Sequence, residues 1–408
     1  MSIWDMAVRN VFRNRRRSLL TFGVVAFGFA AFALAGGFMS QTFSSLQEGT
    51  IRGGVGQLQL ADEAVFEGIE EKTLEHAITE GERVASILRR DPSVDAILPR
   101  IDFLGLISNG ARSIPFLGVG FDPREEARAM ESKALITSGR WFSDPNESEV
   151  VLGTGLARAL NLKAGDSVTL FGTTPDGVLN ALDVTVAGLS DIPIKELNDR
   201  YLATTLPAAS RLLGVSGRVT KIVLTLKPGA REDEVRARLL SALSAGGIRL
   251  SARTWKELAL FYNQVKLLYL GIFGFMGAVL VIVVLLACAN TMTMAAAERT
   301  REIGTLRAIG TSPALVRRMF VAEGIVIAAI GSLAGAVLAL LIRAALNASH
   351  LRLPPPPGAT HGSEIHVAFF GATYVAGLVA MLATLAIASY LPARRASRLP
   401  IVEALSHV

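Results

Sequence analysis

Four long runs of apolar residues stand out in the alternation of hydrophobic and polar positions along the chain. The uncharged stretches cover residues 18–47, 267–297, 324–342 and 367–393. Because an α-helix rises 1.5 Å per residue, about 20 apolar residues cross the roughly 30 Å hydrocarbon core of a bilayer. A soluble protein can contain one buried helix of this kind, but four in one chain indicate a membrane protein. We therefore predict four transmembrane helices, at residues 18–40, 264–294, 320–346 and 367–391.

Between the first two spans the pattern changes to short apolar segments separated by polar ones. Alternation typical of β-strands occurs at residues 93–101, 103–109, 113–120, 148–152, 166–172, 182–190, 200–206 and 221–226. Helical periodicity occurs at residues 71–92, 153–162, 206–214 and 230–246. A hairpin turn is expected at Asp176 and Gly177. The interleaving of helices and strands predicts an extracytoplasmic α/β or α+β domain with two subdomains over residues 41–263.

The segment before the first span has the pattern of an amphipathic helix. Its apolar positions share one helical face, formed by Ile3, Trp4, Ala7, Val8, Val11 and Phe12. The opposite face carries Asp5, Arg9 and Arg13. A helix with this division lies in the plane of a membrane surface with its apolar side toward lipid. We expect residues 1–17 to form such an interfacial helix on the cytoplasmic side.

The distribution of arginines sets the orientation of the spans, because cytoplasmic loops of membrane proteins carry an excess of Lys and Arg. Thirteen arginines lie in the N-terminal segment, between the second and third spans and in the tail: Arg9, Arg13, Arg15, Arg16, Arg17, Arg299, Arg301, Arg307, Arg317, Arg318, Arg394, Arg395 and Arg398. The connection between the third and fourth spans, residues 347–366, contains Arg352 alone. We expect both termini and the tail, residues 392–408, to be cytoplasmic.

Composition agrees with a membrane protein, because 51% of the residues are hydrophobic, 19% are charged and the mean hydropathy is +0.43. The outside segment holds 25 Lys and Arg against 29 Asp and Glu, a net charge of −4. The remaining segments must therefore carry +10 to give the total of +6, so the positive charge is concentrated in the segments expected on the cytoplasmic side. Nucleic-acid binding needs a basic patch on a soluble face, and the sequence shows none. We expect no nucleic-acid partner.

A cleaved signal peptide is the alternative to a permanent first span. The flanking arginines and an A-x-A motif at Ala33 and Ala35 fit that alternative. The apolar run is longer than the roughly 7 to 15 residues typical of signal peptides, so we expect the span to be retained. The single cysteine, Cys288, lies within the second span, and the outside domain therefore has no internal disulfide.

The loop at residues 347–366 contains four consecutive prolines, which favour an extended polyproline II segment. His350, His361 and His366 lie nearby, but their spacing matches no metal-ligand pattern, and we expect no metal site. The spans and loops also show no Ser/His/Asp grouping, H-E-x-x-H motif or pair of carboxylates with catalytic spacing. We do not expect an enzyme.

A charged segment at residues 295–319 separates the second and third spans. We expect the second span to continue as helix into "ERTREIGTLRAIG", with an apolar stripe formed by Ile303, Leu306 and either Ile309 or Ala308. Gly310 is expected to end this helix. No other part of the chain is obviously available to cover the stripe. Two interpretations remain open at this point, a solvated hairpin that only carries charge and a docking helix for a partner protein.

The following helix is expected to begin in the tripeptide "TSP". Thr311 or Ser312 would cap it, and Pro313 would occupy its first turn.

Several stretches resemble the FtsX-like permeases of ABC transporters, the group that contains MacB-type and lipoprotein-releasing LolC/LolE-type subunits. They are "ERTREIGTLRAIGTSP", "YLPARRASRLPIVEAL" and "AVRNVFRNRRRSLLT". The outside domain is similar to the LolC/LolE branch in "PREEARAMESKALITSGRWF" and "SEVVLGTGLARALNLKAGDSVTLFG". The resemblance covers nearly the whole chain and favours the docking interpretation.

In that family the segment between the second and third spans is a coupling helix that sits in a groove of a cytoplasmic ATPase. Carried over by position, the resemblance implies contacts from Glu298, Arg299, Arg301, Glu302, Ile303, Leu306, Arg307 and Gly310. It also implies a dimeric permease, of two identical or two different chains, that assembles with two ATPase copies. The chain lacks a G-x-x-x-x-G-K-[ST] motif, so ATP and Mg would be bound by that separate partner and no cofactor is expected here.

The resemblance further implies a mechanical function, in which closure of the ATPase pair moves the coupling helices and the spans transmit the motion outward. Small residues that let helices pack closely suit such movement. The candidates are Gly271, Gly274, Gly277, Gly331 and Gly335, for which ordinary bundle packing is the alternative explanation.

We expect a non-catalytic permease of the bacterial inner membrane that extracts a lipoprotein or another amphiphilic cargo and passes it to a periplasmic carrier or adaptor. Two alternatives remain. One is MacB-like efflux of peptides or small amphiphiles, and the other is an FtsX-like signalling lever that activates a periplasmic partner.

Overall fold

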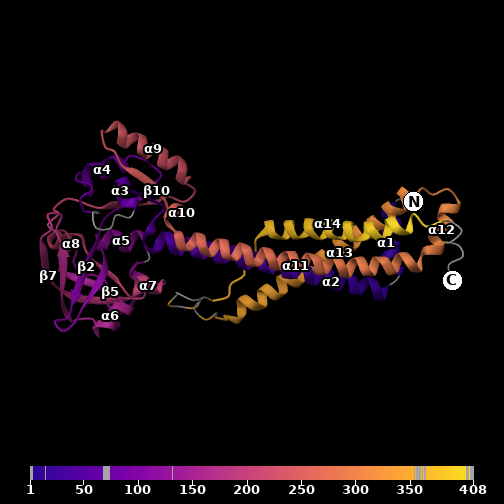
Figure 1. Cartoon of the computed structure of the whole chain (residues 1–408), viewed down its shortest axis with the longest axis horizontal. Coiled ribbons are helices and arrows are strands. Elements are labelled where there is room, and N and C mark those ends of the chain that lie inside the picture. The colour runs from indigo at the N-terminus through magenta and orange to yellow at the C-terminus, as the bar shows by residue number, and fades with distance from the viewer. Residues whose placement is uncertain are drawn as a thin grey trace. The chain divides into compact units, whose positions relative to one another are not determined.

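The computed structural model describes residues 3–13, 15–67, 74–130, 132–352, 354, 360, 362, 364–400 and 404. The chain forms two compact units (Figure 1). We call the first the helical unit; it comprises Met1–Ser44, Val265–Arg352 and Glu364–Val408. We call the second the sheet unit; it comprises Ser45–Gln264 and Leu353–Ser363.

Long helices build the helical unit. Its elements are α1 (Ile3–Arg13), α2 (Arg15–Thr50), α11 (Leu260–Glu298), α12 (Thr300–Ala308), α13 (Pro313–Ser349) and α14 (Gly371–Ala396). Among the described residues, four helices are long and apolar enough to cross a membrane, and they are α2, α11, α13 and α14. The four predicted transmembrane helices are therefore present.

Helix α2 contacts each of the other three long helices. Val25 and Phe29 of α2 belong to one buried cluster with Val284 of α11 and with Met381 and Leu385 of α14. Small residues allow the helices to approach closely in this cluster. The approach of α13 to α2 is one example, and it is described with the candidate glycines below.

Only part of the predicted apolar face of α1 is buried against the helix bundle, and the rest is exposed. Ala7 and Val11 are buried, and α1 packs along α13. The Ser18 hydroxyl donates a 2.6 Å hydrogen bond to the Val11 carbonyl, which fixes the turn between α1 and α2. Trp4 and Phe12 are about half exposed. The helix is confirmed, and its position on a membrane surface stays a prediction.

The sheet unit is a mixed α+β domain. Its strands are β1 (Leu58–Ala61), β2 (Val94–Ser108), β3 (Ser113–Phe121), β4 (Ile136–Gly139), β5 (Glu149–Gly153), β6 (Ser167–Thr173), β7 (Leu179–Ser190), β8 (Tyr201–Thr205), β9 (Lys221–Leu226) and β10 (Ser251–Thr254). They lie in the order β10-β1-β9-β2-β3-β8-β5-β7-β4, with β6 paired to β2 and β7. The pairs β3–β8 and β5–β7 are parallel, and the other pairs are antiparallel.

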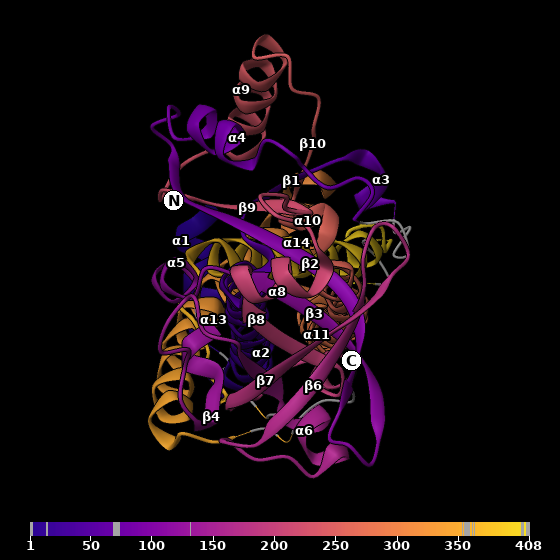
Figure 2. The same cartoon turned by 90° about the vertical axis from the view of Figure 1, so that its left-hand side faces the viewer.

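Helices of the sheet unit are short and follow the strands. They are α3 (Glu63–Phe66), α4 (Gly81–Leu88), α5 (Pro123–Ala129), α6 (Thr154–Leu160), α7 (Lys195–Asn198), α8 (Leu206–Leu213), α9 (Glu232–Ala245) and α10 (Trp255–Leu258). Figure 2 shows α4 and α9 beside the β1, β9 and β10 end, and α8 beside β2 and β3. The class predicted for this domain is confirmed.

Strand β2 joins the two ends of the sheet. Its first half pairs with β9 and its second half with β3 and β6. The sequence pattern predicts two strands here, interrupted at Asp102, and this division is wrong. The Asp102 amide donates a 2.8 Å hydrogen bond to the Thr220 hydroxyl, and its carboxylate pairs with Lys221, so this polar position continues the strand.

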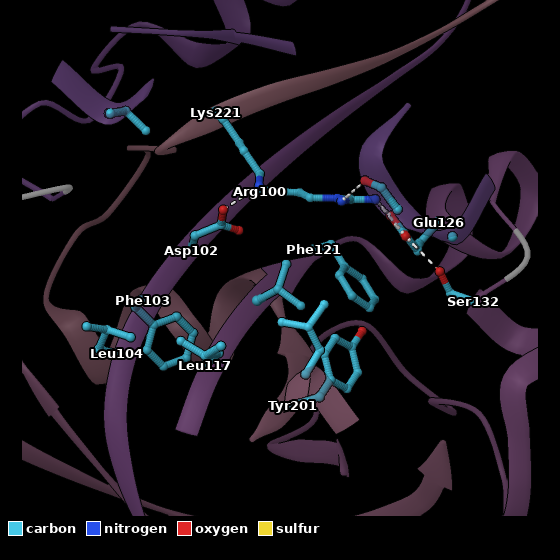
Figure 3. A pocket seen from close by; sticks show the side chains of 16 residues that line it. Arg100, Asp102, Phe103, Leu104, Leu117, Phe121, Glu126, Ser132, Tyr201 and Lys221 are labelled. Atoms are coloured by element: carbon cyan, nitrogen blue, oxygen red, sulfur yellow. Dashed lines mark hydrogen bonds and ion pairs between the residues drawn. The ribbon is translucent and has the colours of Figure 1, made fainter. Parts of the chain in front are cut away.

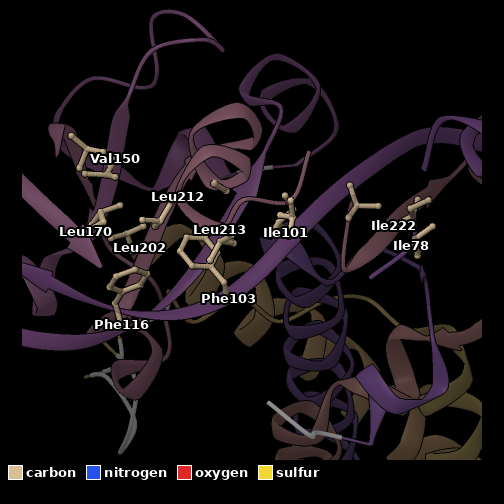
Figure 4. Packing of buried hydrophobic residues seen from close by; sticks show 14 of the residues in the cluster. Ile78, Ile101, Phe103, Phe116, Val150, Leu170, Leu202, Leu212, Leu213 and Ile222 are labelled. Carbon is tan, nitrogen blue, oxygen red and sulfur yellow. The ribbon is translucent and has the colours of Figure 1, made fainter. Parts of the chain in front are cut away.

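The two faces of β2 and β3 have different environments. Leu104 and Leu117, which are cross-strand partners, line a cavity on one face (Figure 3). The neighbouring Phe103 and Phe116 pack in the core beneath α8, with ring centroids 5.6 Å apart, and Phe103 also borders the cavity (Figure 4). This alternation follows from the two-residue period of a strand.

One predicted helix is largely wrong. The pattern at residues 71–92 predicts a single amphipathic helix, but α4 begins at Gly81. Ile78 instead forms a bridge with Val219, which ties this residue to the sheet unit in extended form. Residues 68–73 lie outside the described residues. The predicted hairpin between β6 and β7 is confirmed, with Gly177 at φ +80° in its turn.

Candidate functional site

The site predicted between the second and third spans consists of α12 and its two flanking turns. We expected one continuous helix from the second span, and this is wrong, because α11 ends at Glu298 and Arg299 has non-helical angles of φ −107° and ψ 12°. The Thr300 hydroxyl donates to the carbonyls of Ala296 and Ala297 at 3.1 and 2.9 Å. A side chain thus bonds to carbonyls of the last turn of α11 at the break.

The far end of α12 follows the prediction. Gly310 has φ +99°, a backbone conformation that favours glycine, and its amide donates to the Arg307 carbonyl at 3.1 Å. The next helix begins with Ser312 as its cap, since the Leu315 amide donates to the Ser312 hydroxyl at 3.3 Å. Pro313 occupies the first turn. The sequence left Thr311 and Ser312 as alternatives, and the structure selects Ser312.

The inner side of α12 is buried against the same chain. Ile303 is 4% exposed and packs in a cluster with Val316 and Phe320 of α13 and with Ala393 and Ala396 of α14. The expectation that no part of the chain covers the apolar stripe is therefore wrong. It failed because the covering residues come from two spans that follow α12 in the sequence.

A chain of alternating charges ties α12 to its neighbours, and we call Arg13, Glu302, Arg299 and Glu323 the charge chain. Arg13 of α1 lies 2.6 Å from Glu302, and Arg299 lies 3.1 Å from both Glu302 and Glu323. Arg299 and Glu323 are mostly buried, and the guanidinium also lies 5.8 Å from the Phe320 ring centre. Helices α1, α12 and α13 are thereby linked.

The electrostatics of the charge chain favour an ionised Glu302 carboxylate. The hydrogen bond from Arg13, followed by the one from Arg299, holds the pKa of the Glu302 carboxyl below its ordinary value. A hydrogen bond to the charged form of an acid stabilises that form. Glu302 therefore remains negative at neutral pH and keeps α12 linked to α1.

The structure sorts the eight predicted contact residues by exposure. Those whose side chains or backbone face solvent are Glu298, Arg301, Glu302 and Gly310. Those partly covered are Arg299, Leu306 and Arg307, and Ile303 is buried. The Arg307 guanidinium donates to the Leu399 carbonyl in the C-terminal segment. Contact of these residues with an ATPase stays a prediction.

Ile309 is the exposed apolar residue that the prediction left as an alternative to Ala308. It is 76% exposed and lies at the end of α12, next to Gly310. The sequence could have indicated this exposure, because Ile309 directly precedes Gly310, the glycine expected to end the helix, and so lies beyond the buried turns. Four exposed residues lie in α12 or directly beside its two ends, and we call them the outer surface of α12: Glu298, Arg301, Ile309 and Gly310.

The five candidate glycines fall into two groups. A Cβ on Gly331 would lie 2.8 Å from the Val25 side chain, and one on Gly335 would lie 2.5 Å from the Ala26 carbonyl oxygen, so α13 and α2 are in close contact there. A Cβ on Gly271, Gly274 or Gly277 of α11 would meet no described atom of this chain within 4 Å. The structure brings only the first group against another helix.

Histidines and acids do not gather into a metal-binding group within the described part of the chain. His350 lies 3.7 Å from the Glu364 carboxylate. His361 lies outside the described residues.

Comparisons with known proteins match two regions of the chain. Residues 18–242 match the MacB-like periplasmic core domain, and residues 274–401 match the FtsX-like permease C-terminal family. The chain is 26% identical over 257 residues to the lipoprotein-releasing system transmembrane protein LolC of Neisseria meningitidis, covering 60% of each chain. It is 29% identical over 209 residues to the pyoverdine export ATP-binding/permease protein PvdT of Pseudomonas fluorescens, covering 51% of this chain and 27% of that one.

The matched region spans about three fifths of the length of the lipoprotein-releasing relatives. Among solved structures, the periplasmic region of MacB from Actinobacillus actinomycetemcomitans is similar at 14% identity and a TM-score of 0.38, covering 52% of this chain and 95% of that chain.

Proposed function

Because the chain belongs to the ABC transporter permeases that join a MacB-like periplasmic core domain to an FtsX-like permease region, we propose that it couples ATP hydrolysis by a cytoplasmic ATPase to movement of its sheet unit. Permeases of this family generally work with such an ATPase. The chain itself is the non-catalytic part, and ATP and Mg are bound by the partner.

The observation that carries this proposal is the two-sided character of α12. Its inner side is fixed by Ile303 in an apolar cluster and by the Arg299–Glu323 ion pair. Its outer surface combines an exposed isoleucine with charges of both signs. Apolar anchors surrounded by polar residues are typical of protein interfaces. A force applied to this surface reaches α13 and α14 directly, because α12 is packed on both.

The proposed cargo is a lipoprotein or another lipid-linked amphiphile taken from the outer leaflet of the bacterial inner membrane. Support comes from the relatives with printed roles in lipoprotein release, although they are matched over only part of their length. We further propose cytoplasmic termini, a second permease chain, two ATPase copies and a periplasmic carrier. The second permease chain is either another copy of this chain or a different chain.

A reconstituted complex tests this function. The full chain would be placed in lipid nanodiscs with its cognate ATPase and a fluorescently labelled lipoprotein, and ATP-dependent release of the label to a soluble acceptor would be followed. The proposal predicts release that needs both ATP and the chain. Stimulated ATP hydrolysis by an unlipidated ligand, with no binding of any lipidated cargo, would contradict it.

Export of a small amphiphile is the second candidate, favoured by the similarity to the pyoverdine export protein. A deletion strain separates the two functions. Loss of lipoprotein release with unchanged sensitivity to small amphiphiles supports the first, and the reverse result supports the second.

A further inference from the structure

A cavity of about 460 Å³ lies in the sheet unit and shares no lining residue with α12. It is lined by residues of β2, β3, β8 and β9 (Figure 3). The strand residues that line it include Asp102, Leu104, Leu117, Tyr201 and Lys221. Its size falls within the roughly 300–1,000 Å³ of small-molecule sites.

The register of the strands builds an apolar wall for this cavity. Leu104 of β2 is opposite Leu117 of β3, which is in turn opposite Tyr201 of β8. Leu104 is 39% exposed, and Leu197, which also lines the cavity, is 42% exposed. Water meets leucine side chains here at a cost of roughly 25 cal/mol for each Å² of apolar surface. An apolar ligand would remove that contact.

The charged groups of the cavity neutralise one another. Arg100 donates to the Glu126 carboxylate at 2.8 and 3.0 Å, and this pair is almost fully buried. Ser132 donates to the same carboxylate at 2.9 Å, and Lys221 pairs with Asp102. Two cations meet two carboxylates, so the cavity offers no excess charge for a strongly anionic or cationic ligand.

Two donors in the cavity remain without an acceptor. The buried Arg100 Nε has no hydrogen-bond partner among the described residues. The Tyr201 hydroxyl, which points into the cavity in Figure 3, also makes no hydrogen bond within the described part of the chain. Burial raises the pKa of the Tyr201 phenol, and the negative charge of the Glu126 carboxylate raises it further. The phenol therefore remains a neutral hydrogen-bond donor. A buried donor without a partner, such as the Arg100 Nε, is rare and costly, whereas the half-buried Tyr201 hydroxyl is open to the cavity.

We propose that this cavity binds a hydrocarbon chain ending in an uncharged acceptor, namely the ester or amide carbonyl of an acyl group. The chain lies along Leu104, Leu117 and Leu197, and the carbonyl accepts a hydrogen bond from Tyr201. The two internal ion pairs leave no free charge to attract a carboxylate or phosphate. This site requires no ATPase and stands independently of the coupling function.

Photolabelling of the full chain in nanodiscs tests the proposal. The probe is a monoacylglycerol with a 16-carbon chain that carries a diazirine near its end, and adducts are located by peptide mass mapping. The proposal predicts adducts on β2 and β3 at the cavity. Labelling confined to the transmembrane helices would overturn it.

Leu104 and Leu106 provide a matched pair of variants. Both leucines project from the same face of β2 and are similarly exposed, at 39% and 44%, but only Leu104 lines the cavity. Leu104→Asn should reduce adducts on β3 about tenfold, because a leucine that contacts the hydrocarbon chain is replaced by a polar group. Leu106→Asn should leave them unchanged. Equal labelling of the two variants, with unchanged melting temperatures, would contradict the proposed site.

Tyr201→Phe tests the carbonyl. The loss of one hydrogen bond should lower labelling by the monoacylglycerol about fivefold. A diazirine probe with the same chain and no carbonyl should label this variant as well as the original protein. If a fatty acid anion or an unlipidated peptide displaces the monoacylglycerol as well as an unlabelled monoacylglycerol does, the assigned ligand class is wrong.

Discussion

Ile303 and Ile309 lie six positions apart near the two ends of α12 and differ in exposure from 4% to 76%. Burial decides which of them stabilises the fold, since a side chain contributes through the water it excludes. Ile303 therefore belongs to the packing of the helical unit. Ile309 contributes little to that packing and is available to a partner.

Alanine substitutions separate these two roles. Ile303→Ala should lower the free energy of unfolding by about 2–4 kcal/mol, because it leaves a cavity in a packed cluster. Ile309→Ala should change it by less than about 0.5 kcal/mol and should reduce the amount of ATPase that co-purifies at least about fivefold. Thermal melting and co-purification measure the two effects. An Ile309→Ala variant that retains all of its ATPase would contradict the assignment of the outer surface.

Neighbouring glutamates in α5 provide a second test at this scale. Glu126 is buried with Arg100, whereas Glu125 is exposed and pairs with Arg128. Glu126→Gln leaves a buried guanidinium without its counter-charge, and should cost about 3–5 kcal/mol in urea unfolding of the sheet unit. Glu125→Gln should cost less than about 1 kcal/mol, as expected for a surface pair. Equal costs would show that the Arg100–Glu126 pair is not buried in solution.

At the scale of elements, α12 is held by both of its ends. The break at Arg299 separates it from α11, and Gly310 separates it from α13. These breaks let α12 lie against α13 and α14 instead of extending from the second span. Its orientation therefore depends on a few backbone positions.

Gly310→Ala tests the second of these breaks. A Cβ at Gly310 would meet no described atom within 4 Å, so the effect comes from the backbone angle of φ +99° alone. We expect a loss of about 1–2 kcal/mol in stability and weaker ATPase binding. Gly23→Ala is the control, because it also adds a methyl group to open space but in an ordinary helix. No difference between the two variants would contradict the strained turn.

The charge chain predicts a pH dependence for α12. The folded pKa of Glu302 lies below its ordinary value, so the link to Arg13 contributes fully above the usual carboxyl pKa of about 4.3. This contribution to the stability of α12 is lost as the pH falls through the lowered pKa that Glu302 has in the folded state. Hydrogen exchange of α12 should therefore accelerate in acid beyond the intrinsic rate. Glu302→Gln should remove this pH step, and a step of equal size in that variant would assign it to another group.

Sequence patterns predicted the elements whose causes are local. The four spans follow from uncharged runs, and the turn at Gly310 and Ser312 follows from residues with strong backbone preferences. The break at Arg299 has no local signal of this kind in the sequence, and Arg299 pairs with Glu323, 24 residues later. The contact between Arg13 and Glu302 joins residues 289 positions apart. Short strands such as β1 were missed because their partners, β9 and β10, are also distant in the sequence.

At the scale of the whole molecule, the chain combines a helical unit for the membrane with a sheet unit that has its own core and its own cavity. The coupling proposal concerns α12, and the ligand proposal concerns β2, β3 and β8. The two sites share no residue, so failure of one leaves the other intact. The cavity accounts for the exposure of Leu104 on a well-packed sheet, whereas Leu106 is similarly exposed without lining it.

Site-specific cross-linking from α12 tests the central claim most directly. The single cysteine is buried in α11, so Cys288→Ser gives a background in which Ile309→Cys carries the only reactive thiol. With a photoactivatable maleimide at that position, we predict a cross-link to an ATPase in membranes of the native host, and none from Val8→Cys on the exposed side of α1. Absence of any ATPase adduct from position 309, or equal adducts from position 8, would contradict the account.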